Sequence, residues 1–324
     1  MSVEFKATGK EDFLAAIAKF IGSKVENGVV KLPKNIGTGF IKGFKINPHM
    51  QIVIRQYELK EDWVLKRMIG KQEKEVIVIA FHNIFNSKTD FNKSAGMGNH
   101  LPSVQINTAG FDYELFLPAK TEMNAIIIMV HVDYLKELLN PIEGNILLRT
   151  ITSGKGPFLF EEPISSKILD VASEIVDAKI PEELQQFYFK IKAEELIFLL
   201  FVELLKRRDI SVQVLNGADI KTIYQVKEKM LLDLDMPPRL KELAKFSGMS
   251  ESKLKRLFKQ IFGKSIYHYY QSFRMREAAY LIKEEKLSVS EAGYRLGFSN
   301  LSHFTRIFET HIGLKPKAYS MDNG

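Results

Sequence analysis

The stretch GMSESKLKRLFKQIFG, residues 248–263, sets basic side chains between apolar positions at helical spacing. A second stretch, GFSNLSHFTRIFETHIG, residues 297–313, repeats this pattern fifty residues later, except that the opening glycines, Gly248 and Gly297, lie forty-nine residues apart. The second copy therefore carries one inserted residue after its glycine. The matching pairs are Leu254 with Phe304, Arg256 with Arg306, Phe258 with Phe308, Gly263 with Gly313, and Tyr269 with Tyr319.

The excess positive charge of the chain is confined to the segment that carries this repeat. From Ala218 to the C-terminus there are 19 Lys and Arg against 12 Asp and Glu, a net charge of +7, and the preceding 217 residues are neutral. Such a segment attracts polyanions, because neutralising phosphates releases condensed counterions. A solvated basic surface has the same composition, so charge alone leaves both interpretations open. The repeat favours a polyanion-binding module.

The composition excludes several classes of protein. A chain of 324 residues is long enough for two domains with substantial cores. Cysteine is absent, which excludes disulfides, thiol nucleophiles and cysteine-based metal sites. The N-terminal residues do not read as a secretory signal, and no apolar run approaches the ~20 residues of a membrane span. We expect a cytoplasmic protein without membrane contact.

The N-terminal part alternates short β-prone runs with turn residues. The runs are QIVIRQYEL (51–59), KEVIVIAFHNIF (74–85), SVQINTAGFDYELFLPA (103–119) and NAIIIMVHV (124–132). Several short strands at this spacing predict a small barrel or sandwich. The pattern becomes helical near Asp133. We therefore expect an α+β chain, with a β-rich barrel or sandwich and helices over 1–210, a linker at 211–218, and an all-α domain over 219–324.

Two helices are predicted at 165–178 and 182–208. The apolar face of the second is wider than one packing partner usually requires. Burial within its own domain and a face shared between two subunits of a homodimer are both open interpretations. The residues of this face are Phe187, Phe189, Ile191, Leu196, Ile197, Leu199, Leu200, Val202, Leu204 and Leu205.

The C-terminal domain is predicted to consist of helices separated by Gly or Pro residues. They are predicted over 220–233, 239–246, 251–261, 265–284, 289–296, 301–310 and 316–320. Gly248 and Gly297 each follow a short helix and can adopt the left-handed conformation that ends it. Ser250 and Ser299 are placed to cap the next helix. A short helix, a glycine turn and a basic helix form a helix-turn-helix motif, present here twice.

Each basic helix has an apolar side and a polar side. Leu254, Leu257, Phe258 and Ile261 of the first, and Phe304, Ile307 and Phe308 of the second, are predicted to face inward. The opposite side carries groups that can bind phosphates and base edges in DNA. The candidate DNA-binding residues are Ser252, Lys253, Lys255, Arg256, Lys259, Leu301, Ser302, Thr305 and Arg306.

The predicted helix at 265–284 joins the two motifs. At ~1.5 Å per residue it spans roughly 30 Å, and major grooves on one side of B-DNA recur every ~34 Å. It could hold two recognition helices about one turn of DNA apart. Its predicted buried residues are Ile266, Tyr270, Phe273, Ala278, Leu281 and Ile282.

The segments LAKFSGMSESKLKRLFKQIFGKSIYHYYQSFRMREAAYLI and AGYRLGFSNLSHFTRIFETHIGLKPKAYS together resemble the DNA-binding domain of the AraC family of transcriptional regulators, with its pattern G-F-S, F-x-R-x-F and G-x-x-P-x-x-Y. The resemblance covers Asp219 to Ser320. It implies that Ser252, Arg256, Leu301, Ser302 and Arg306 read bases.

Two positions depart from the family pattern. Ala292-Gly293 stands where the family prefers Ile-Ala, and Ser320 where it usually has Arg. Glycine inside a helix costs ~1 kcal/mol relative to alanine. We therefore expect a looser second motif and a weaker grip on one phosphate.

Family resemblance also implies a β-rich N-terminal domain, cupin-like in fold, that binds a small effector and helps two subunits pair. GTGFIKGFKINPHMQIVIRQYELKEDW (37–63) and the 248–263 stretch weakly resemble the siderophore-responsive branch, which makes a siderophore one candidate effector. In the alternative interpretation, the N-terminal domain only dimerises or recruits a protein. If the chain is an activator, RNA polymerase is a further partner.

Nothing in the sequence argues for catalysis, a cofactor or a metal. His49, His82, His100 and His131 lack close ligand spacing and regular carboxylate companions, so we expect ordinary histidines. No nucleophile-elbow pattern is present. An enzyme fused to a DNA-binding tail would need a convergent acid, base or nucleophile that the sequence does not reveal.

Overall fold

A computed structural model describes residues 2–7, 13–69, 75–84, 102–108, 113–140, 145–153, 158–207 and 215–321. They form two compact units, one ending at Asp219 and the other beginning at Ile220. Each unit contains a buried apolar cluster of its own. Of the expected linker, residues 211–214 lie outside the described residues, and Gly217 already begins a helix.

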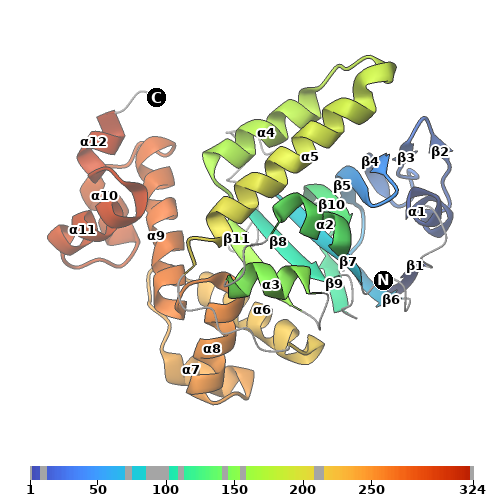
Figure 1. The fold of residues 1–324 in the computed structure, drawn as a ribbon. Coiled ribbons are helices and arrows are strands. Elements are labelled where there is room, and N and C mark those ends of the chain that lie inside the picture. The colour runs from blue at the N-terminus through green and yellow to red at the C-terminus, as the bar shows by residue number, and fades with distance from the viewer. Residues whose placement is uncertain are drawn as a thin grey trace. The chain divides into compact units, whose positions relative to one another are not determined.

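An antiparallel sheet of eight strands organises the N-terminal unit (Figure 1), in the order β11-β8-β7-β10-β5-β4-β3-β2. A second sheet has the order β1-β6-β9, with β1 parallel to β6. Among the described strands, β11 and β2 are the free edges of the large sheet, so it is not a closed barrel. The strands are β1 (Ser2–Ala7), β2 (Val25–Glu26), β3 (Val29–Lys31), β4 (Gly37–Asn47), β5 (Met50–Leu59), β6 (Trp63–Ile69), β7 (Val76–His82), β8 (Ser103–Thr108), β9 (Tyr113–Leu117), β10 (Glu122–His131) and β11 (Leu159–Pro163).

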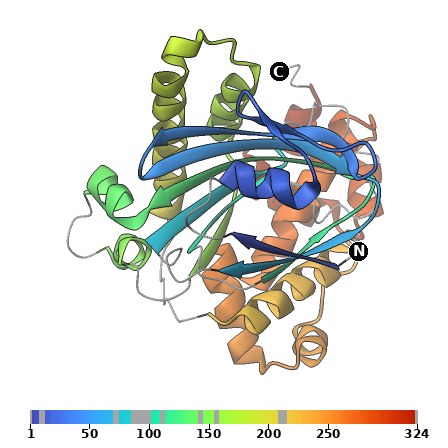
Figure 2. The same ribbon diagram turned by 90° about the vertical axis from the view of Figure 1, so that its right-hand side faces the viewer.

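Helices cover both faces of the large sheet. Figure 2 shows α4 and α5 side by side and α1 against the strands. The described helices of this unit are α1 (Phe13–Ile21), α2 (Val132–Leu139), α3 (Ile146–Thr152), α4 (Ser166–Asp177) and α5 (Glu182–Leu204). Successive residues of a strand point to opposite faces of the sheet. When both faces are covered, the sequence of the strand is therefore a continuous apolar run. This accounts for runs such as NAIIIMV.

Two apolar clusters lie on the two faces. One contains Ile52, Ile79 and Ile128 from three neighbouring strands, packed with Phe189 and Leu196 of α5. The other contains Val53, Val78 and Met129, each adjacent to one of those residues on the same strand, packed with Leu14 and Ala18 of α1. The first cluster fixes α5 on the sheet and so determines which side of α5 remains exposed.

Some sequence expectations for this unit need correction. The run 103–119 is two strands, β8 and β9, which belong to different sheets, with residues 109–112 outside the described residues. The helix expected over 182–208 ends at Leu204. Helix α1 and strands β1, β2, β3, β4, β6 and β11 were not predicted, since they lie outside the β-prone and helical runs identified in the sequence.

The C-terminal unit consists of helices in the described residues, which confirms the expected α+β class of the whole chain. Their bounds are α6 (Gly217–Leu231), α7 (Leu240–Ser247), α8 (Glu251–Phe262), α9 (Ile266–Lys283), α10 (Val289–Arg295), α11 (Leu301–Ile312) and α12 (Pro316–Met321). No helix in the described part of the chain is both long enough and apolar enough to span a membrane.

The turn glycines of the two motifs face different surroundings. Gly248 (φ 64°) and Gly297 (φ 73°) both adopt the left-handed conformation. A Cβ placed on Gly248 would meet nothing within 4 Å, whereas one placed on Gly297 would lie 2.2 Å from the backbone oxygen of Asp235. The second turn is therefore packed against the α6–α7 connection, and the first is open.

Alanine substitutions should separate the cost of the left-handed conformation from the cost of the close approach to Asp235. Gly248→Ala should lower the free energy of unfolding by about 1–2 kcal/mol, the cost of a left-handed residue with a Cβ. Gly297→Ala should cost roughly 1–3 kcal/mol more, because the clash with a backbone oxygen adds an overpacking penalty. Denaturant unfolding followed by far-UV circular dichroism measures both. Equal losses would show that the approach of Gly297 to Asp235 is unimportant.

Candidate nucleic-acid interface

The first motif is built from α7, the turn at Gly248 and α8. The N–H of Gly248 donates to the carbonyl of Lys245 and ends α7. The Ser250 hydroxyl accepts a hydrogen bond from the backbone N–H of Lys253 (3.3 Å) and starts α8, as expected. Gly263 (φ 68°) then ends α8 with a bond to the carbonyl of Lys259. Both ends of this helix are therefore fixed by local hydrogen bonds.

Helix α8 separates apolar from basic residues as the sequence predicted. The inward residues, Leu254, Leu257, Phe258 and Ile261, are all buried. Of the candidate DNA-binding residues of this helix, Lys253 is half-buried, and Ser252, Lys255, Arg256 and Lys259 are exposed.

The second motif is built from α10, the turn at Gly297 and α11, and its second helix has a different N-cap residue. Ser288 and Glu291 form a reciprocal capping box at the start of α10. The cap of α11 is Asn300, whose side-chain oxygen accepts from the N–H of His303 (3.0 Å). The expected cap, Ser299, is therefore wrong. The residue inserted after Gly297 moves the start of the helix forward by one, so Asn300 takes the place of Ser250.

The contacts inside the two motifs are equivalent as well. The rings of Phe258 and Tyr269 meet edge to face, with centroids 5.4 Å apart. The rings of Phe308 and Tyr319, fifty residues later, meet in the same way at 5.6 Å. The sequence repeat is thus a repeat of packing.

Helix α11 packs closely on α10. Phe304 and Phe308 are buried, and Ile307 is half-buried against the same cluster. A Cβ placed on Gly293 would lie 2.8 Å from Leu301 Cδ2 and 3.3 Å from Phe304 Cδ1. The expectation that Gly293 loosens the second motif is wrong, because its missing side chain is what lets α11 approach.

The candidate DNA-binding residues of α11 differ in exposure. Ser302 and Arg306 are exposed and Thr305 is half-buried. Leu301 is also half-buried, since its side chain lies against Gly293. Only part of the Leu301 side chain is therefore available for contact with DNA.

The guanidinium groups of Arg256 and Arg306 lie at equivalent positions of the two motifs, and neither forms an ion pair within the described residues. Arg295 of α10, in contrast, is paired with Glu285 at 2.8 Å. An exposed guanidinium without a carboxylate partner keeps its donors available for phosphate or for guanine O6 and N7.

Helix α9 joins the motifs through a buried charge. All six of its predicted core residues are buried, and so is Arg274, with 3% of its surface exposed. Its guanidinium donates to the carbonyls of Leu296 and, at 3.4 Å, of Asp235, and lies 4.1 Å from the ring centroid of Phe298. Burial lowers the pKa of Arg274. This one side chain ties α9 to the second turn and to the α6–α7 connection.

Sequence reasoning missed Arg274 although a signal was present. Arg274 lies four residues after Tyr270 and four before Ala278, on the apolar face of the predicted helix. A charged residue on such a face requires partners inside the core.

Histidines and carboxylates in the described N-terminal residues do not gather into a group that could hold a metal ion. The rings of His49 and His131 lie 5.9 Å apart, and His131 Nε2 is 3.2 Å from Glu75. The residues that the structure describes contain no group of three or more side chains able to hold a metal ion. His100 lies outside those residues.

Comparison with known proteins places the interface in a family. The family described as "Helix-turn-helix domain" matches residues 243–321. The multiple antibiotic resistance protein MarA of Escherichia coli is 30% identical over 108 residues, which are 33% of this chain and 85% of MarA. A solved AraC-type regulator of Chromobacterium violaceum is 25% identical, covers 34% of this chain and 100% of its own, and has a TM-score of 0.31.

The chain belongs to the AraC family of transcriptional regulators. Another relative is the HTH-type transcriptional regulator GlxA of Rhizobium meliloti, 29% identical over 108 residues, which are 33% of each chain. The family resemblance seen in the sequence is confirmed, and the chain is a DNA-binding transcription regulator rather than an enzyme. The comparisons do not support the siderophore-responsive branch. These matches cover the C-terminal third of this AraC-family regulator.

Glu277 of α9 introduces a pH dependence into this unit. The pKa of Glu277 is raised from 4.5 to about 7, mainly by burial and also by the carboxylate of Glu285, while Arg295 opposes the shift. The folded state therefore favours the protonated carboxyl group. Its stabilising effect is complete below pH 4.5 and is lost as the pH rises through 7.

Glu277→Gln should therefore raise the melting temperature more at pH 8 than at pH 5, because the amide mimics the protonated form and does not ionise. Thermal unfolding at the two pH values measures the difference. Glu309→Gln, at an exposed position of α11, is the matched control and should change the melting temperature by the same amount at both pH values. A Glu277→Gln effect independent of pH would contradict the assignment.

Proposed function

We propose that this AraC-family regulator reads its operator with both recognition helices, pairs with a second copy through α5, and responds to a small effector bound by the N-terminal unit. The observation that carries the first part is the equivalence of α8 and α11, each with a buried apolar side and an exposed side bearing an unpaired arginine.

In this proposal the exposed side chains divide into two roles. Arg256 and Arg306 contact guanine edges in two successive major grooves, assisted by Ser252, Ser302 and the exposed part of Leu301. The remaining candidates, Lys253, Lys255, Lys259 and Thr305, position the helices on phosphates. Helix α9 supports this arrangement, because its 18 residues span about 27 Å and connect the two motifs rigidly.

Arg256→Ala and Arg306→Ala should each weaken operator binding by ~1–3 kcal/mol and relax the preference at one base pair. Fluorescence anisotropy with operator variants at fixed salt measures both effects. Arg295→Ala is the control, because this arginine of the second motif is already paired with Glu285. Equal losses on every DNA sequence would assign the two arginines to phosphates instead of bases.

The dimer proposal rests on the outer side of α5. Phe189, Leu196 and Leu200 are buried on its inner side. A second apolar stripe is exposed almost opposite, with Phe187 at 64% and Phe198 at 63% exposure. Its residues are Leu184, Phe187, Ile191, Phe198, Val202 and Leu205. An apolar stripe of this length favours an interface.

The spacing of the stripe fits a second copy of the chain. The intervals along it are three, four, seven, four and three residues, the same in either direction. An antiparallel neighbour related by a twofold axis would therefore set Leu184 against Leu205, Phe187 against Val202, and Ile191 against Phe198 of the second copy. Contacts of this reciprocal kind define an isologous dimer interface.

Charges at the centre of the stripe are compatible with this pairing. Glu194 is bound by Lys190 at 2.9 Å, and Glu195 by Lys192 at 2.9 Å. The carboxylates that would approach their counterparts at the twofold axis are thus neutralised within each copy. The hydroxyl of Tyr134 also donates to Glu194 (3.1 Å), which holds that carboxylate to the body of the unit.

Phe198→Asp should weaken the dimer by at least ~2 kcal/mol, roughly thirtyfold, because it places a carboxylate in the apolar seam. Sedimentation equilibrium over a concentration series measures the dissociation constant. Leu138→Asp, at an exposed apolar position of α2, should leave it unchanged. A dimer equally stable in the Phe198 variant would exclude this face of α5.

Effector binding would act by shifting populations. A ligand that favours one arrangement of α4 and α5 would alter how two copies pair and so the occupancy of the operator. In the alternative, the N-terminal unit only dimerises or recruits a protein. If the regulator activates transcription, RNA polymerase is a further partner. A cytoplasmic location follows from the DNA partner.

A further inference from the structure

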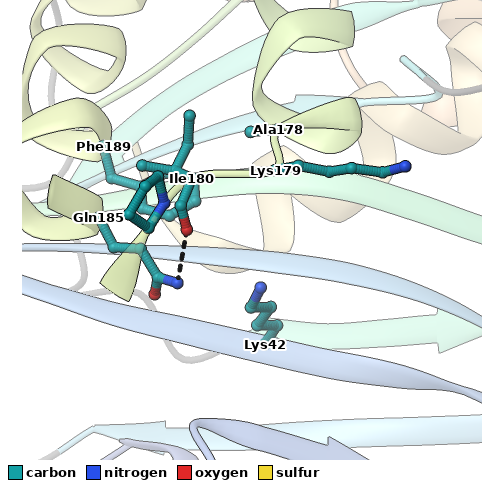
Figure 3. Close-up of a pocket in the computed structure, with 7 residues that line it drawn as sticks. Lys42, Ala178, Lys179, Ile180, Gln185 and Phe189 are labelled. Carbon is teal, nitrogen blue, oxygen red and sulfur yellow. Dashed lines mark hydrogen bonds between the residues drawn. The ribbon is translucent and has the colours of Figure 1, made fainter. Parts of the chain in front are cut away.

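A cavity of about 360 Å³ lies in the N-terminal unit between β4 and the start of α5 (Figure 3). Its size is within the range of small-molecule sites. The walls come from the middle of β4, the α4–α5 connection and the first turns of α5. The lining residues are Lys42, Ala178, Lys179, Ile180, Pro181, Gln185 and Phe189.

Lys42 is a half-buried cation that lacks a counter-charge. It forms no ion pair within the described residues, and its Nζ lies over the ring of Phe44, 4.7 Å from the ring centroid. Figure 3 shows its ammonium group pointing toward the α4–α5 connection across the cavity. A partly desolvated ammonium without a partner is costly, and an anion in the cavity would remove that cost.

Lys179 adds a second positive charge at the edge of the cavity. Its side chain is exposed, extends away from Lys42 in Figure 3, and forms no ion pair within the described residues. Three exposed carboxylates, Asp177, Glu182 and Glu183, occur in the same part of the chain, but none lines the cavity. The groups that a ligand would touch are therefore cationic or neutral.

The remaining walls combine hydrocarbon with the neutral amide of Gln185 and are held by local contacts. Ala178, Ile180, Pro181 and Phe189 supply hydrocarbon surface. The ring of Phe189 stacks on that of Phe44 with centroids 3.9 Å apart. The Gln185 amide donates to the carbonyl of Ile180 (3.2 Å) and ties the connection to the helix. A bound molecule thus meets one ammonium inside, with hydrocarbon and neutral polar groups around it.

We propose that this cavity binds a small organic anion, a carboxylate with a compact apolar body, whose charge is held by Lys42 and secondarily by Lys179. As an effector site it rests on the sensing role proposed above. The cavity reaches the first turns of α5, which also carry Leu184 and Phe187 of the dimer stripe. A ligand joining β4 to this end of α5 would favour one position of the stripe and so change the affinity of the dimer. By linkage, dimerisation would change the affinity for the ligand by the same factor.

Isothermal titration calorimetry of the full chain with matched probes tests the site. Phenylacetate combines the carboxylate with an apolar body, acetate lacks the body, phenylacetamide lacks the charge, and phenethylammonium reverses it. Butanoate and naphthylacetate vary the size of the body. We expect saturable binding of at least one larger carboxylate, at least tenfold tighter than the binding of acetate, the amide or the ammonium. Equal binding of the amide and the acid, or no saturable binding of any carboxylate below about 1 mM, would overturn the proposal.

Substitutions locate the bound anion. Lys42→Gln should weaken binding of the best carboxylate at least tenfold, Lys42→Arg should retain most of it, and Lys179→Gln should weaken it severalfold. Lys45→Gln, at an exposed lysine of the same strand, is the matched control and should have no effect. Circular dichroism checks that each variant is folded. If the Lys42→Gln variant is not folded, the affinity of the Lys42→Arg variant tests the assignment. Unchanged affinity in Lys42→Gln, or a loss in Lys42→Arg as large as the loss expected for Gln, would overturn the assignment.

Binding of the carboxylate can be tested separately from DNA binding. The Arg256→Ala variant should bind the carboxylate as the unaltered chain does, since the two sites lie in different units. If the chain binds operator DNA but no carboxylate, the inference about the cavity is wrong and the proposed DNA recognition is unaffected.

Discussion

The guanidinium of Arg274 is the interaction on which the geometry of the DNA-binding unit depends. It lies among buried residues of α9, with carbonyl partners at Leu296 and Asp235 and the ring of Phe298 at 4.1 Å. Its Nε has no hydrogen-bond partner within the described residues, so the surrounding contacts must offset a real desolvation cost. In return, one side chain fixes the second turn to α9, and with it the direction of α11. The close approach of Gly297 to Asp235 reinforces this connection.

Three helices of this regulator share a two-sided construction. Helices α8 and α11 each bury aromatic and aliphatic residues on one side and expose arginine on the other. Helix α5 buries one apolar side on the sheet and exposes a second apolar stripe. The chemistry of each outer side indicates its partner, because donors and positive charge suit a nucleic acid whereas a self-complementary apolar stripe suits another copy of the same helix. The cavity beside Lys42 lies at the start of α5, where a ligand could influence that stripe.

The sequence predicted the C-terminal unit well, because short-range rules determine it. Glycines that adopt φ > 0, serine caps and the helical spacing of apolar residues are local signals, and they set most helix bounds within one or two residues. One failure, the cap expected at Ser299, is local, because the inserted residue shifts the cap to Asn300. The other failures arise from contacts between residues farther apart in the sequence. Whether Gly293 loosens or tightens a helix depends on Leu301 and Phe304 opposite, and the partners of Arg274 lie 22 and 39 residues away. In the N-terminal unit, strand order, the division of 103–119 between two sheets and the cavity at Lys42 are likewise set by pairing across the fold.

The central claim is that two equivalent basic helices, joined rigidly by α9, enter successive major grooves on one face of a duplex. Methylation interference on an operator fragment, which detects guanines whose N7 must remain free, tests it most directly. The account predicts two clusters of interfering guanines about one helical turn, roughly 10 base pairs, apart on the same face of the DNA for each bound copy. A single cluster per copy, or two clusters on opposite faces, would contradict it.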